Sequence, residues 1–152
     1  MPIHIQHVES PDDAQCEAVN AILRTHNRRA NPDFWAAREM PENEPVPIHL
    51  FAYDDGGTIV GGLFGTTQFA WLKVDIMAVA EAARGAGIGR ALLQRAEDLA
   101  RERGCTKAYV DTMDYQAPGF YQKLGYRVTG TLEDWDSLGH AKFFLVKSLG
   151  AS

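Results

Sequence analysis

The sequence predicts a single α/β domain over residues 1–152, built on a mixed, mostly antiparallel sheet of about seven strands with helices on both faces. Two observations indicate this class. Segments with the alternating polarity of strands are interleaved with segments that have helical periodicity. A glycine-rich turn at 84–90 then joins one strand directly to a long amphipathic helix. The chain length suits one domain with a real core.

The N-terminal part is predicted to begin with a strand over 3–8, where apolar and polar residues alternate. Ser10-Pro11 is typical of a helix start, and apolar residues then follow at helical spacing as far as His26. The stretch 27–46 is polar and rich in proline, so we expect a loop with one short helix around Phe34-Trp35.

The centre of the sheet is predicted from three strands. Residues 48–53 and 58–65 form a hairpin around the turn signal Asp55-Gly56. A longer strand over 69–79 follows, and its apolar side chains are expected on one face: Leu72, Val74 and Ile76.

After the glycine-rich turn, a helix is expected to run to about Arg103, with Gly104 closing it. The remaining pattern predicts four more elements: a strand over 107–112, a short helix over 117–124, and strands over 126–132 and 142–148.

Composition excludes several classes of function. The formal net charge is −5 and no basic stripe is present, which argues against nucleic acid as a partner. No apolar run reaches the ~18 residues of a membrane span, and the N-terminus lacks signal-peptide features, so a cytoplasmic protein is expected. Cys16 and Cys105 are far apart and predict reduced thiols. No His or Cys cluster has metal-ligand spacing, so no metal is expected.

The run Arg84-Gly85-Ala86-Gly87-Ile88-Gly89-Arg90 predicts a phosphate cradle. Glycines leave backbone N–H groups bare, and the helix that follows adds the positive end of its dipole. A P-loop would need Lys and Ser or Thr after Gly89, and the dinucleotide fingerprint would need a glycine at position 90 or 92. Both of these alternatives fail, and a different nucleotide-like cofactor is indicated.

The pattern Arg-x-x-Gly-x-Gly, filled by Arg84, Gly87 and Gly89, resembles the central motif of the GNAT superfamily of acyl-CoA-dependent N-acyltransferases. Met77-Ala78-Val79 precedes it as in that family, and 120–126 (Phe-Tyr-Gln-Lys-Leu-Gly-Tyr) resembles the family's second hallmark. The resemblance covers nearly the whole chain in element order and is sharpest over 72–149. A smaller bacterial subgroup is resembled by the signature Asp-Thr…Gln-Ala-Pro…Phe-Tyr over 111–121, which is followed by Gly-His at 139–140.

The resemblance implies the GNAT fold, in which the sheet is splayed at its centre and acetyl-CoA lies between the strands carrying 77–79 and 109–111. Backbone groups of Met77 and Val79 would pair with pantetheine, and amides of the glycine turn would take the diphosphate. Thr112 or Gln116 would replace an asparagine that many members carry. The full set of expected cofactor residues is Met77, Ala78, Val79, Arg84, Gly85, Ala86, Gly87, Ile88, Gly89, Arg90, Thr112, Gln116 and Tyr121.

The implied reaction is direct transfer of an acetyl group to a primary amine. Tyr121 is the expected proton donor to the leaving thiol. Asp75 is the expected base or amine-orienting group, since strand alternation would put it on one side with Met77 and Val79. A structural ion pair with Lys73 is the alternative, and three other carboxylates compete for the role of base: Asp111, Asp114 and Glu133.

For the acceptor, residues His26, Asn27 and Trp35 lie where the family's substrate-facing helices lie, and Asp111 suggests an acidic pocket floor that would attract a cationic amine. The acceptor is expected to be a small-molecule or N-terminal amine, and a homodimer is plausible. Two alternatives stay open: a transferase for another acyl-CoA, and a CoA-binding sensor without turnover.

Overall fold

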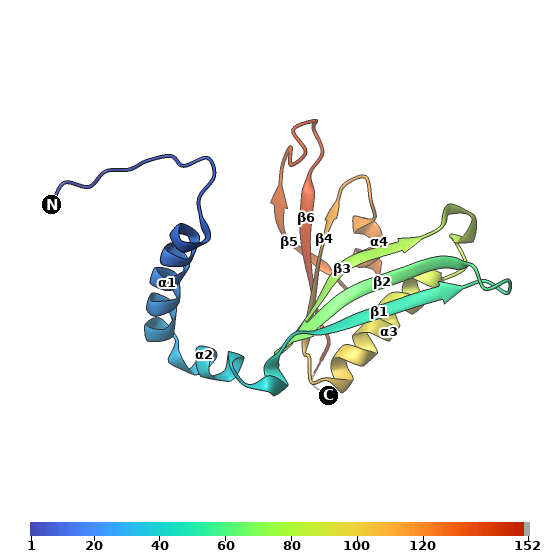
Figure 1. Cartoon of the computed structure of the whole chain (residues 1–152). Coiled ribbons are helices and arrows are strands. Elements are labelled where there is room, and N and C mark those ends of the chain that lie inside the picture. Colours follow the sequence, from blue (N-terminus) through green and yellow to red (C-terminus); the bar gives the residue numbers. More distant parts are fainter. Residues whose placement is uncertain (151–152) are drawn as a thin grey trace. The chain divides into compact units, whose positions relative to one another are not determined.

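The computed structural model describes residues 1–150 and divides into two compact units, Met1–Glu44 and a larger unit from Pro45 onward. Figure 1 labels the helices and strands of both. Among the described residues, no helix is long and apolar enough to cross a membrane. Each unit is described by itself below, and the larger unit holds the sheet.

The smaller unit consists of two helices and a helical turn. α1 spans Asp13–Ala30 and begins with a capping box between Asp12 and Gln15. α2 spans Pro32–Arg38, capped by the Asn31 side chain, and the 3-10 turn η1 spans Pro41–Asn43. The helix starts confirm the expectation from Ser10-Pro11 to within a few residues.

The predicted strand over 3–8 is wrong. These residues have no regular secondary structure, and Ile3 and Ile5 are exposed. Alternating polarity suits a strand, but a strand also needs a neighbouring edge that pairs with its backbone. The described sheet has six strands instead of about seven, and residues 3–8 are not among them.

The larger unit is a six-stranded sheet in the order β1-β2-β3-β4-β6-β5. Every neighbouring pair is antiparallel except β3 and β4, which confirms the mixed, mostly antiparallel sheet. The strand bounds are β1 Val46–Tyr53, β2 Ile59–Gln68, β3 Trp71–Val79, β4 Lys107–Met113, β5 Arg127–Leu132 and β6 Lys142–Ser148.

Helix α3, Ile88–Glu102, packs against β1, β2 and β3 and forms the core with them. The 3-10 turn η2, Glu81–Ala83, leads into it, and the short helix α4 spans Pro118–Lys123. The largest side chains that are fully buried come from the sheet and from α3: Leu63, Leu72, Leu93 and Leu145. Gly104, with φ of 85°, follows the end of α3 as predicted.

A β-bulge at Asp75 changes the pattern of β3. Gly65 of β2 pairs with Val74 and Phe64 pairs with Ile76, so Asp75 is an extra residue without a cross-strand partner. Val74 is buried as predicted, but Ile76 is 59% exposed. The expectation that Ile76 shares a face with Val74 is therefore wrong, because one inserted residue reverses the alternation after it.

The bulge also overturns the expected grouping of Asp75 with Met77 and Val79. Met77 and Val79 pack against the core that α3 covers. The Asp75 side chain instead lies beside Lys73, a residue that is exposed where its neighbours Leu72 and Val74 are buried. Asp75 thus lies on the outer face, which we define as the sheet face opposite α3.

We expect Gly65→Ala to lower the free energy of unfolding by about 1–3 kcal/mol. A Cβ at Gly65 would lie 2.7 Å from the carbonyl oxygen of Lys73, and backbone must shift to make room for it. Gly130→Ala is the matched control, because a Cβ there would meet its nearest neighbour at 3.9 Å. Urea unfolding of both variants tests this; equal stability would show that the backbone around the bulge yields easily.

The two central strands diverge after the bulge. The parallel pairing of β3 with β4 covers only Trp71–Val74 against Lys107–Val110. Beyond these residues the strands separate, as Figure 1 shows. One edge of β3 from Asp75 to Val79 therefore faces a gap instead of a paired strand. This confirms the splayed sheet that the resemblance implies.

Candidate active site

The glycine-rich turn has the backbone geometry of an anion cradle. Gly85 and Gly87 have φ values of 84° and 79°, a conformation that side chains disfavour. A Cβ added to either would meet no atom within 4 Å, so open space lies beside them. Gly87 caps α3 and offers no side chain to its first amides, unlike the caps of α1 and α2. The amides at the start of α3 are thus open to an anion.

Gly89 has a different role from the other two glycines. It lies within α3 and its Cβ would come within 3.3 Å of the Phe120 ring. The glycine therefore allows the start of α3 to approach α4 closely. Sequence reasoning assigned all three glycines to the cradle, because the contact with Phe120 joins residues far apart in the chain.

The two arginines that flank the turn differ in their surroundings. Arg84 donates from Nε to the Val79 carbonyl oxygen at 3.2 Å, which ties the turn back to the end of β3. Arg90 is exposed in the first turn of α3. Both lie next to the cradle in sequence, and contact with phosphate remains a prediction for each.

Tyr121 of α4 has a buried ring and an accessible hydroxyl. The residue is 5% exposed, and its ring packs edge-on against Phe120 and Tyr126, with centroid distances of 5.3 and 5.6 Å. Among residues 1–150, every side-chain oxygen that is inaccessible to solvent has a hydrogen-bond partner. The Tyr121 hydroxyl has no hydrogen-bond partner among the described residues. The hydroxyl must therefore reach solvent. Burial raises the pKa of Tyr121 to about 12, so the phenol keeps its proton at neutral pH.

Thr112 and Gln116 come together at the end of β4. The side-chain oxygen of Gln116 accepts from the Thr112 hydroxyl at 3.2 Å and from the Met113 amide at 2.8 Å. Thr112 is 4% exposed. Both residues thus fasten the segment that leads to α4, and the amide NH₂ of Gln116 stays available for a ligand.

The predicted acidic residues of the outer face are ion-paired. Asp75 lies 3.3 Å from Lys73 Nζ and accepts from the Thr66 hydroxyl at 3.4 Å. Asp111 lies 3.4 Å from Lys142 Nζ. The Asp75 hydrogen bond and charge, with smaller effects of Tyr109 and Asp111, raise the pKa of Lys73. The expected acidic pocket floor is therefore neutralised, because β6 brings a lysine beside Asp111.

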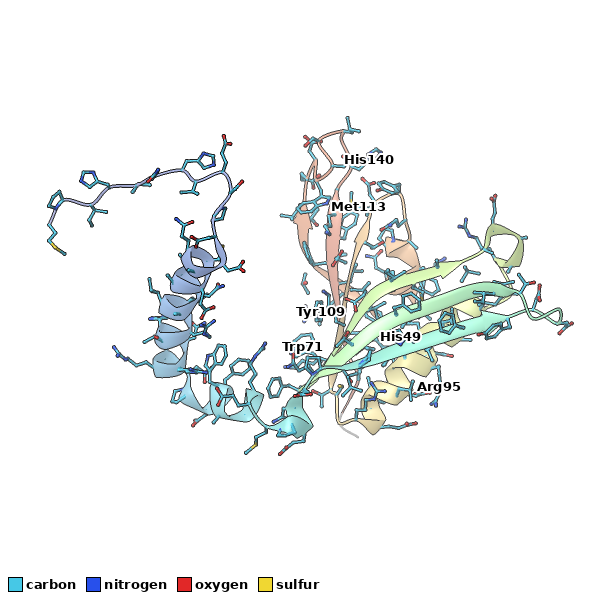
Figure 2. All side chains as sticks on the ribbon, in the orientation of Figure 1. His49, Trp71, Arg95, Tyr109, Met113 and His140 are labelled. Atoms are coloured by element: carbon cyan, nitrogen blue, oxygen red, sulfur yellow. The ribbon has the colours of Figure 1, made fainter. Side chains whose placement is uncertain are left out.

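A groove that the sequence did not reveal lies on the outer face. Its volume is about 570 Å³, within the range of small-molecule sites. Trp71, Lys73, Tyr109 and Phe144 contribute to its walls. Figure 2 places Trp71 and Tyr109 where the strands converge, and their rings lie 5.5 Å apart. The groove thus adjoins Asp75 through Lys73, which lines it.

The loop between β5 and β6 is fastened by two carboxylates. Asp136 accepts from the amides of Leu138 and His140 and lies 2.5 Å from His140 Nδ1, while Asp134 accepts from the Gly139 amide. Asp114, one of the three rival bases from the sequence, accepts from the Ala141 amide at 2.9 Å. These carboxylates accept hydrogen bonds from backbone amides and so stabilise the conformation of the loop.

We expect His140 to titrate above its ordinary pKa of 6.5, because Asp136 bonds and attracts the charged imidazole. A raised folded pKa adds stability below the unfolded value, and that contribution is lost as pH rises through the folded value. In Asp136→Asn the pKa of His140 should fall back toward 6.5. NMR titration of the imidazole in both proteins measures it; an unchanged pKa in the variant would exclude Asp136 as the cause.

Two of the three predicted acceptor residues, Asn27 and Trp35, make contacts within the smaller unit. His26 is exposed on α1, and the Asn27 carbonyl accepts from the Asn31 amide. The guanidinium carbons of Arg28 and Arg38 lie 5.9 and 5.6 Å from the centre of the Trp35 ring. These contacts suit packing of the unit, and an acceptor role for the three residues stays a prediction. Within the part of the chain described, no group of three or more His, Cys, Asp or Glu side chains could hold a metal ion.

Comparison with known proteins agrees with the geometry. Residues 14–126 match the acetyltransferase (GNAT) family. The chain is 44% identical over 131 residues to a blasticidin-S acetyltransferase of Streptomyces morookaense, covering 84% of this chain and 96% of that protein. A crystal structure of an acetyltransferase from Bacillus cereus ATCC 14579 has a TM-score of 0.74 and 30% identity, with 94% and 97% of the two chains covered.

A more distant structure, a putative streptothricin acetyltransferase from Bacillus anthracis str. Ames solved with acetyl-CoA, shares the fold with a TM-score of 0.61 and 20% identity over 70% of this chain and 64% of its own. Three findings point to the same family: the open glycine cradle, the splayed strands and the match over 14–126. The chain therefore belongs to the GNAT acetyltransferase family and is an N-acetyltransferase that uses acetyl-CoA.

Proposed function

We propose that the chain acetylates a primary amine of a small molecule of the type that the blasticidin-S acetyltransferase modifies. One observation carries this proposal. The 44% identity extends over 96% of that relative, so the two proteins share far more than the cofactor motif. The groove on the outer face supports a small acceptor, because its volume of about 570 Å³ suits one.

The cradle and the free edge of β3 are proposed to hold the co-substrate. Acetyl-CoA, when bound, supplies the acetyl group and the thiol that leaves. The amides from Gly85 to Arg90 would bind the diphosphate, and the backbone of Met77 to Val79 would pair with the pantetheine. The gap between β3 and β4 supports this, since β3 has an unpaired edge there.

Two side chains are proposed to move protons. The acceptor amine has an ordinary pKa near ~10.4 and must lose a proton before it attacks. Asp75, on the outer face beside the groove, would take that proton or orient the amine while Lys73 balances its charge. Tyr121 would donate its phenolic proton to the departing sulfur as the C–S bond breaks. Its accessible hydroxyl and high pKa support that role.

Release of free thiol from acetyl-CoA tests the proposal. Purified protein should release thiol with blasticidin S, and mass spectrometry should find the acceptor heavier by one acetyl group. Streptothricin and a peptide with a free N-terminus serve as competing acceptors. Turnover of the peptide alone would contradict a small-molecule acceptor. CoA binding without turnover of any of the three acceptors would contradict the proposed acceptor class.

Two further expectations from the resemblance need their own measurements. Thermal-shift assays with acetyl-, propionyl- and succinyl-CoA compare acyl chains, and acetyl-CoA should stabilise the protein most. Sedimentation equilibrium tests the predicted homodimer.

A further inference from the structure

A buried carboxylate of the core is paired with a half-buried lysine beside Tyr126. Glu97 of α3 is 2% exposed and lies among apolar neighbours on that helix. Lys147 of β6 donates to both of its carboxylate oxygens, at 2.6 and 3.0 Å. Removing a carboxylate from water is unfavourable, and stability alone is a weak reason to bury one with its partner. The reaction described above uses neither residue, so the pair needs another explanation.

Tyr126 links this pair to the chain just after α4. Its hydroxyl donates a long hydrogen bond of 3.5 Å to Glu97 Oε2, and the Lys147 ammonium lies 5.6 Å from the centre of its ring. Its backbone amide donates to the Tyr121 carbonyl oxygen at 3.0 Å. Tyr126 is 3% exposed and therefore fixed by contacts at the hydroxyl, the ring face and the backbone.

The Tyr126 ring in turn packs against Tyr121. The two rings meet at 72° with centroids 5.6 Å apart. Between them in sequence, Gly125 has φ of 94°, and the stem of Lys147 passes close enough that a Cβ at Gly125 would lie 3.4 Å from its Cε. α4 itself has six residues and no side-chain cap, so the helix alone holds Tyr121 weakly.

We propose that Glu97, Lys147 and Tyr126 form a rigid bracket that positions the phenol of Tyr121 toward the leaving thiol. The three are positioning residues that act through Tyr121, and the inference rests on the proton-donor role proposed above. A proton donor must lie within hydrogen-bond reach of its target, so a small rotation of the ring lowers the rate. The bracket gives a reason for the ion pair beside the aromatic contact between Tyr126 and Tyr121.

Tyr126→Leu tests the proposal, because it removes the ring that Tyr121 packs against while Glu97 keeps Lys147. We expect kcat to fall by about tenfold or more and KM for acetyl-CoA to stay within about twofold. Tyr126→Phe removes only the hydroxyl and should show a smaller loss of kcat. The matched controls are Tyr53→Leu and Tyr53→Phe, since Tyr53 is 60% exposed on the edge strand β1.

A double-mutant cycle separates positioning from simple loss of structure. In a Tyr121→Phe background, Tyr126→Leu should cause no further loss of kcat, because no hydroxyl is left to position. Equal losses in both backgrounds would overturn the bracket. If Tyr126→Leu does not fold, Tyr126→Phe enters the cycle in its place with the same two outcomes.

The cycle also tells two failures apart. Wild-type activity of Tyr121→Phe would remove the proton donor and with it the bracket. Impaired Tyr121→Phe with fully active Tyr126 variants would overturn the bracket alone and leave the proposed function standing. Thermal unfolding of every variant confirms that each is folded at the assay temperature.

Discussion

Replacement of Tyr121 by Phe is expected to lower kcat by about 100-fold or more, the usual range for loss of a proton donor. The substitution removes one oxygen from a ring that is 5% exposed and packed against two aromatic neighbours. The packing is kept, so KM for acetyl-CoA should change by less than about twofold. Thiol release at saturating acetyl-CoA and blasticidin S measures both constants.

The pH dependence of the variant adds a second check. Because burial raises the pKa of Tyr121 to about 12, the phenol is protonated throughout the neutral range. The ratio of wild-type to variant kcat should therefore be constant from about pH 6 to about pH 9. Tyr53→Phe, the same change at an exposed site, should be fully active. A Tyr121→Phe enzyme with wild-type kcat would exclude the phenol as donor.

Much of this fold follows from local signals in the sequence. Asp55-Gly56 marks the turn that Asp54 fastens with its side chain, and Gly104 marks the end of α3. The glycine-rich run marks the turn before α3, and Gly85 and Gly87 have left-handed backbone there. These features depend on residues within a few positions of one another, and single residues such as glycine have strong preferences there.

Features set by two distant segments were not predictable in the same way. The bulge at Asp75 adds one residue to β3 relative to β2, and the alternation of β3 alone does not reveal it. The alternation therefore misplaced Ile76 and grouped Asp75 with Met77 and Val79. Gly65, whose missing side chain allows the close approach of β3, was a signal that could have pointed to this irregularity.

The electrostatics of the site depends on distant pairing in the same way. Asp111 meets Lys142, which β6 brings beside β4 from far along the chain. Glu97 is buried on α3, and Lys147, which pairs with it, comes from β6 far along the chain. A sequence identifies the charged residues, but only the strand order decides which of them meet.

Replacement of Gly87 by Val is expected to abolish CoA binding. Gly87 has φ of 79°, which a β-branched residue strongly disfavours, and its Cβ would project into the open space where the diphosphate is proposed to lie. The turn must either change its backbone and turn its amides away, or place two methyl groups in the path of the phosphates. Calorimetric titration with CoA measures the loss directly.

Gly104→Val is the matched control for this change. Gly104 has φ of 85° with open space around it, and it follows the opposite end of α3. Both variants therefore carry a similar backbone strain at the two ends of one helix, and both should lose a similar part of their stability. Only Gly87→Val should lose CoA. Wild-type CoA affinity in Gly87→Val would exclude the cradle, while equal losses of affinity in both variants would trace the effect to damage of α3 as a whole.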